Sequence, residues 1–80
     1  MIMYRLSDYR HIVTPVLEKF RDRDHIPPLD RISLTVQMTQ VPLLCVAEIY
    51  KELYGTSEVL ESFIEKLKKF YQSDIEEETP

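Results

Sequence analysis

The stretch VPLLCVAEIYKELYGTSEVLESFIEKLKKFYQ, residues 41–72, decides the fold of this 80-residue chain. It predicts two amphipathic helices, over 42–54 and 57–72, which meet at Gly55, the only glycine. Ser57 is placed to cap the second helix. The apolar residues of that helix fall on one face: Val59, Leu60, Phe63, Ile64, Leu67, Phe70 and Tyr71. Two apolar faces on either side of a tight turn predict a C-terminal helical hairpin.

The first helix of this hairpin has its own apolar stripe, formed by Leu43, Val46, Ala47, Tyr50, Leu53 and Tyr54. From the two stripes we expect a core that includes Val46, Leu53, Leu60, Ile64 and Leu67. Val41, Leu44 and Cys45 lie outside the main stripe, so the first two turns are apolar nearly all round. A segment of this kind is usually covered on two sides. The second cover is either the N-terminal helix or another subunit.

The N-terminal part predicts one helix over residues 8–24, with Ser7 or Asp8 as its cap. Ahead of it, the alternation in MIMYRL indicates a short strand. Pro15 removes one backbone hydrogen bond from the helix. The helix therefore either runs through with a kink or is split, with Thr14 capping a second piece. The first solution is favoured because one apolar face continues in phase: Tyr9, Ile12, Val13, Val16, Leu17 and Phe20.

Residues 31–38 predict a half-buried strand. Two prolines at 27–28 make the preceding segment an extended connector. In the sequence RISLTVQMT, apolar Ile32, Leu34, Val36 and Met38 alternate with Arg31, Ser33, Thr35 and Gln37. An extended backbone places the four apolar residues on one face, whereas a helix would divide them between opposite sides. Pro42 then suits the first turn of the next helix.

These elements predict a single small α+β domain over residues 1–73, mostly helical with one or two short strands; the alternative is an all-α bundle. The apolar content of 44% is enough for a modest core. The net charge of −4 is uneven, because four of the 14 acidic residues lie in the segment 74–80. Residues 1–73 carry ten acidic and ten basic residues, so we expect a neutral body and a solvated acidic tail at 74–80.

No catalytic constellation can be written from this sequence. His11 and His25 are distant from Cys45, and no pair has the spacing of metal ligands. Cys45 lies between Leu44 and Val46, which is typical of a small buried hydrophobic residue. We therefore expect a protein that is not an enzyme and that uses no metal or cofactor. A single cysteine and the absence of a signal peptide or a long apolar run predict a cytoplasmic location.

Over residues 31–72 the order strand, helix, glycine turn, helix resembles the ribbon-helix-helix family of DNA-binding dimers. The resemblance rests on RISLTVQMT, the helix after it, and the turn Gly55–Leu60. It implies that two strands pair across a twofold axis and that outward polar residues read the major groove. Carried over by position, the readers would be Arg31, Ser33, Thr35 and Gln37. Arginine and glutamine are residue types that contact guanine and adenine.

Charge favours a protein partner over DNA. Only Arg31 of those four residues is basic, and the flanking helices carry Glu48, Glu52, Glu58 and Glu61. Phosphate neutralisation supplies most nucleic-acid affinity. We therefore expect a non-enzymatic interaction or regulatory module that binds another protein chain or a second copy of itself, with a DNA-binding regulator as the alternative. Aromatic residues of the hairpin are of the types that anchor interfaces, and the expected partner-binding residues are Leu44, Tyr50 and Tyr54.

Overall fold

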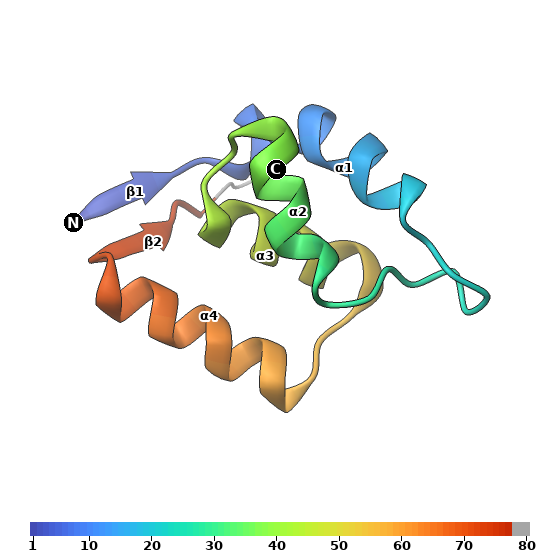
Figure 1. Ribbon diagram of the computed structural model, residues 1–80. Coiled ribbons are helices and arrows are strands. Elements are labelled where there is room, and N and C mark those ends of the chain that lie inside the picture. The colour runs from blue at the N-terminus through green and yellow to red at the C-terminus, as the bar shows by residue number, and fades with distance from the viewer. Residues whose placement is uncertain (78–80) are drawn as a thin grey trace.

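The computed structural model describes residues 1–77, and its central element is α3, Leu43–Tyr54. Three helices pack against α3: α1 (Arg10–Lys19), α2 (Arg31–Thr39) and α4 (Glu58–Phe70). Figure 1 shows α4 along one side of the molecule, with α1 and α2 on the other. Half of the α3 residues are buried: Leu44, Cys45, Val46, Ala47, Ile49 and Tyr50. The second cover that its apolar first turns require is thus supplied by this chain.

The C-terminal helical hairpin is confirmed, with bounds close to those expected. Gly55 ends α3 with a φ of 90°, a conformation that L side chains rarely adopt, which explains the glycine there. Ser57 caps α4, because its side chain accepts a hydrogen bond from the Leu60 backbone N–H at 3.2 Å. Acidic residues occupy the first turn of α4 and basic residues the last, as the helix dipole favours.

The N-terminal helix is shorter than predicted. A 3₁₀ turn at Leu6–Asp8 precedes α1, and Tyr9 rather than Ser7 or Asp8 is the N-cap residue. The helix runs through Pro15 without interruption, as the continuous apolar face indicated. It ends at Lys19, and the charged segment that follows, predicted to be helical to residue 24, is a turn. Nothing in that segment is apolar enough to continue the buried face, so packing does not extend the helix.

The predicted strand at 31–38 is wrong, because these residues form the helix α2. The face that α2 buries is set by i, i+3 spacing through Ile32 and Thr35, while Met38 is 54% exposed. Two threonine hydroxyls donate to the carbonyl four residues earlier, Thr35 to Arg31 at 2.8 Å and Thr39 to Thr35 at 2.7 Å. These bonds let threonine, whose side chain favours strands, sit inside the helix.

The physical reason for the helix is the neighbourhood of this segment. A strand needs a partner for its backbone N–H and C=O groups, whereas a helix satisfies them within itself. Residues 31–39 lie against α1 and α3, both of them helices. The helix ends at Gln40, which has a left-handed φ of 61° and donates its N–H to the Val36 carbonyl. Alternation of residue types did not decide the structure here; the available packing partners did.

The two strands of the fold are the ends of the described chain. β1 (Ile2–Tyr4) pairs in parallel with β2 (Ser73–Ile75), in the register Ile2 with Ser73. β1 lies within the N-terminal segment expected to form a short strand. β2 overturns the expected start of the acidic tail at residue 74, because Ser73 is buried and Ile75 packs against the core. Glu76 is still held, through its N–H to the Tyr4 carbonyl at 2.7 Å. Residues 78–80 of the expected tail lie outside the described residues.

The fold class is confirmed as a small, mostly helical α+β domain, and the parallel strand pair distinguishes it from an all-α bundle. Four of the five expected core residues are buried: Val46, Leu60, Ile64 and Leu67. The fifth, Leu53, is 42% exposed, although Tyr54 in the same turn of α3 packs against the core. Val13 and Leu17 of α1 complete the centre of the core, both with no exposed surface.

Candidate protein-interaction site

The apolar face of α4 is wider than the part that packs on α3. The buried residues are Leu60, Ile64 and Leu67. Beside them run Val59, Phe63 and Phe70, which are 69%, 37% and 79% exposed. Their 4- and 7-residue spacing places these three side chains on one line along the helix, here named the outer stripe. The outer stripe is therefore an apolar surface that this chain leaves largely uncovered.

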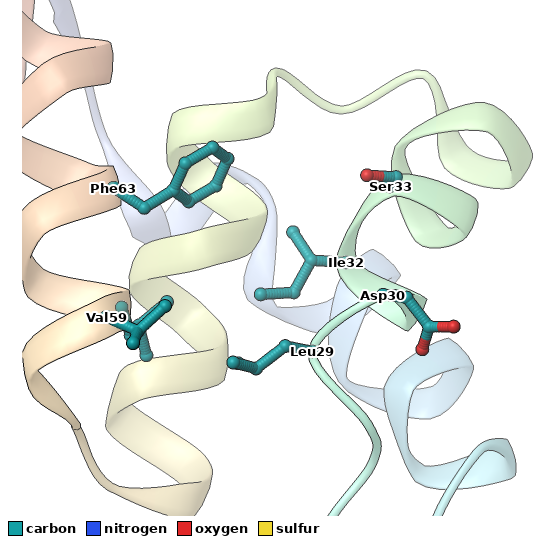
Figure 2. Close-up of a pocket in the computed structure, with 7 residues that line it drawn as sticks. Leu29, Asp30, Ile32, Ser33, Val59 and Phe63 are labelled. Carbon is teal, nitrogen blue, oxygen red and sulfur yellow. The ribbon is translucent and has the colours of Figure 1, made fainter.

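A groove of about 300 Å³ lies between the start of α2 and the first half of α4. Figure 2 shows Val59 and Phe63 reaching from α4 towards Leu29 and Ile32, while the Asp30 carboxylate points away. Leu60 completes the apolar lining, and the polar lining consists of Asp30 and Ser33. Leu29 is itself exposed, so apolar groups form both walls. The groove thus extends the outer stripe into a concave apolar site.

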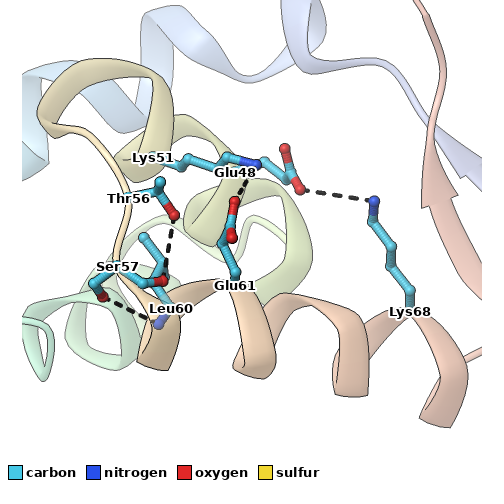
Figure 3. A network of polar contacts seen from close by, with 7 residues as sticks. All are labelled: Glu48, Lys51, Thr56, Ser57, Leu60, Glu61 and Lys68. Atoms are coloured by element: carbon cyan, nitrogen blue, oxygen red, sulfur yellow. Dashed lines mark hydrogen bonds and ion pairs between the residues drawn. The ribbon is translucent and has the colours of Figure 1, made fainter.

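The opposite flank of α4 is closed by polar contacts with α3, which Figure 3 shows. Lys51 pairs with Glu61 at 3.6 Å, and Lys68 pairs with Glu48 at 3.9 Å. Lys68 also contacts Asp74 at 3.1 Å, which ties α4 to β2. The burial of Leu60, Ile64 and Leu67 sets how α4 is rotated on α3, and these contacts lie beside that buried face. That rotation turns the outer stripe away from α3.

The predicted partner-binding residues Leu44, Tyr50 and Tyr54 do not form an exposed surface. Leu44 and Tyr50 are buried, and the Tyr50 hydroxyl donates to the Pro27 carbonyl at 2.5 Å. Tyr54 is half-buried with its ring 5.2 Å from that of Tyr50, and its hydroxyl has no hydrogen-bond partner among residues 1–77. Burial raises the pKa of both phenols. The Tyr50 hydroxyl therefore ties the connector before α2 to α3.

The predicted DNA-reading residues Arg31, Ser33, Thr35 and Gln37 lie on a helix and do not form one row. Thr35 is completely buried. The Arg31 guanidinium stacks on the Phe20 ring at 5.5 Å from its centroid. Only Ser33 and Gln37 are exposed. The structure therefore brings none of these side chains together at a strand face.

A second apolar hollow, of about 290 Å³, lies where the strand pair meets the start of α3. Its lining includes Ile2, Leu43 and Tyr71. The Tyr71 ring packs edge-on against Phe70, with 4.8 Å between centroids. The outer stripe thus ends beside this hollow, at the C-terminal end of α4.

The groups that would carry chemistry are not arranged for it. Cys45 is completely buried, and desolvation raises the pKa of its thiol to about 12, so the thiol stays protonated near neutral pH. His11 and His25 are exposed. Across residues 1–77, no three His, Cys, Asp or Glu side chains gather where they could hold a metal ion. In the same part of the chain, no helix is both long and apolar enough to cross a membrane.

No protein-family model, curated protein or solved structure matches this chain. Its function must therefore be inferred from the surfaces described above.

The residues of the site, Val59 and Phe63, belong to the stripe that the sequence indicated, but their exposure could not be predicted. The available signal was the width of that stripe. Seven apolar residues between 59 and 71 occupy more of the helix circumference than α3 alone covers. The role of Leu29 could not be predicted from the sequence, because it lies in a connector in which apolar residues do not recur at a regular spacing.

Proposed function

We propose that this protein is a non-enzymatic interaction module that acts by binding another protein chain through the groove between α2 and α4. The observation that carries the proposal is the outer stripe: Val59, Phe63 and Phe70 stand exposed on one line beside an apolar groove. Contiguous exposed apolar surface marks interaction sites more often than scattered apolar residues do. A cytoplasmic location remains part of the proposal, in keeping with the buried Cys45 thiol.

The shape of the site supports recognition of a helix or a short apolar segment. A groove with apolar walls on α4 and on the connector before α2 can receive side chains spaced one helical turn apart. Phe63 lines the groove from the α4 side, and aromatic residues in partly enclosed positions contribute strongly to binding. Ser62 borders the stripe on its outer side, and Lys66 lies on the line of the stripe between Phe63 and Phe70. The two side chains supply the polar groups that such interfaces have at their rim.

The alternative, a DNA-binding regulator of ribbon-helix-helix type, has less support. It requires a paired strand at residues 31–38, and this segment is helical. It also requires basic residues near the reading surface, whereas α3 carries Glu48 and Glu52 and α4 begins with Glu58. The protein-binding proposal needs neither condition.

Site-specific photo-crosslinking in the native host tests the proposed function. A photoreactive amino acid replaces Phe63 in one variant and Glu65 in a second, because Glu65 lies on the same helix but away from the groove. We expect a protein adduct with the Phe63 variant and none with the Glu65 variant. Equal adducts from both positions, or no adduct from Phe63, would refute the site.

A further inference from the structure

The charges beside the outer stripe follow the direction of α4. Glu58 lies at its start, and Lys66 and Lys69 lie near its end; all three are exposed. Unlike Glu61 and Lys68, which pair with α3, none of the three has an ion-pair partner among residues 1–77. With Glu65, which is also exposed and has no ion-pair partner among residues 1–77, α4 carries two unpaired negative charges and two unpaired positive charges, and the positive ones lie nearer its end.

Two copies of α4 in antiparallel orientation have complementary charges, because the acidic start of each helix then faces the basic end of the other. Glu58 and Lys69 are 11 residues apart, about 16 Å along the axis, with Phe63 near the midpoint. When a second α4 lies antiparallel on the outer stripe, Glu58 of each copy faces Lys69 of the other. The same register brings Val59 within a turn of the second Phe70 and places the two Phe63 rings next to each other. The dipoles of two antiparallel helices also attract each other.

From this match we infer that the occupant of the outer stripe is a second copy of this chain, docked as an antiparallel α4 pair. The inference rests on the proposed function, since it names the chain that the same surface binds. A twofold axis across Phe63 makes the interface isologous, the commonest arrangement of homodimers. A parallel pair would place Glu58 against Glu58 and Lys69 against Lys69, which is repulsive. The charge pattern thus favours a second copy as the partner and an antiparallel direction for it.

Sedimentation equilibrium on the purified chain tests the inference through a charge exchange. The variants are Glu58→Lys, Lys69→Glu and the double variant, and Asp24→Lys, in the exposed connector between α1 and α2, is the matched control. Each single variant places two like-charge pairs in the dimer and should weaken association roughly tenfold. The double variant should restore association to within about threefold, and the control should leave it unchanged. Circular dichroism verifies that every variant is folded.

A second variant, Phe63→Glu, should abolish the dimer, because it places two buried charges at the twofold axis. A wild-type chain that sediments as a monomer at millimolar concentration would overturn the inference, as would a double variant no better than the singles. If the monomer still forms a Phe63 adduct with a different protein, the inference fails while the proposed function stands. If the monomer forms no adduct, both fail.

Discussion

Two tyrosines that pack against each other should respond in opposite ways to loss of their hydroxyl groups. The Tyr50 hydroxyl donates to the buried Pro27 carbonyl at 2.5 Å, whereas the buried Tyr54 hydroxyl has no partner among residues 1–77. Replacement by phenylalanine removes one oxygen and leaves the ring, so neither substitution creates a large cavity. The two substitutions therefore measure how much each hydroxyl group contributes to the free energy of unfolding.

Tyr50→Phe removes a hydrogen bond and leaves the Pro27 carbonyl buried without that donor, and both effects lower the free energy of unfolding. A hydrogen bond contributes about 1 kcal/mol net, and an unsatisfied buried acceptor costs about 1–3 kcal/mol. We expect the free energy of unfolding to fall by about 1–3 kcal/mol. For Tyr54→Phe, the variant removes an unsatisfied group, so we expect no loss and a gain of up to about 2 kcal/mol.

Urea unfolding followed by circular dichroism measures both values, and an unchanged m-value confirms that the comparison is between like states. In a domain of this size, 1 kcal/mol shifts the melting temperature by about 4–8 °C. Tyr50→Phe should therefore melt at a lower temperature than the wild type, and Tyr54→Phe at the same or a higher temperature. A larger loss for Tyr54→Phe than for Tyr50→Phe would refute the assignment of hydrogen bonds at this site.

Three further perturbations test other parts of the fold. Leu67→Ala empties a site between α4 and α3 and should destabilise by about 2–5 kcal/mol in the same urea assay; a loss below about 1 kcal/mol would show that α4 does not pack there. Gly55→Ala forces a φ of 90° on an L residue and should cost about 1–3 kcal/mol, although no atom blocks the new methyl group. Cys45 should make the stability of the fold depend on pH, because burial raises the pKa of its thiol to about 12. The burial of the protonated thiol contributes fully to the free energy of unfolding below about pH 9, the ordinary thiol pKa, and this contribution is lost as pH rises towards 12. The free energy of unfolding should fall by up to about 1.4 kcal/mol per pH unit above pH 9. Between pH 9 and 10 this slope should be shallower in Cys45→Ala, which keeps the part that Tyr50 and Tyr54 contribute through their raised pKa values.

The sequence predicted the α3–α4 hairpin because every local signal agreed there. The apolar period, the Ser57 cap, the charges at both helix ends and the Gly55 stop all point to the same two helices. Gly55 is the clearest case, since its backbone conformation requires glycine. Such agreement makes the prediction independent of the rest of the fold.

The α2 segment and β2 could not be predicted in this way, because their structure depends on distant neighbours. Alternation from Ile32 to Met38 suits a strand, but α1 and α3 offer a helical neighbourhood instead. β2 follows α4 within an acidic segment, and it forms because β1, about 70 residues earlier, pairs with it. A long-range parallel pair leaves little local signal.

The candidate site was half predicted for a related reason. The apolar stripe of α4 was visible in the sequence, but which part of it is covered depends on how Leu60, Ile64 and Leu67 pack into the core. Leu44 and Tyr50 belong to an equally apolar helix and are buried, because α1, α2 and α4 together surround α3. A wide apolar stripe in the sequence indicates that part of a helix face stays exposed. The packing of the helices decides which part that is.

The central claim, that the outer stripe of α4 is an interface between two copies, is tested most directly by fluorine NMR. Phenylalanine occurs at three positions, so uniform fluorophenylalanine labelling reports on Phe63 and Phe70 in the stripe and on Phe20. Phe20 follows the last residue of α1, and its ring lies under the Arg31 guanidinium. As the protein concentration rises, the resonances of Phe63 and Phe70 should shift together while that of Phe20 stays fixed. Resonances of Phe63 and Phe70 that stay unchanged up to millimolar concentration would contradict the claim.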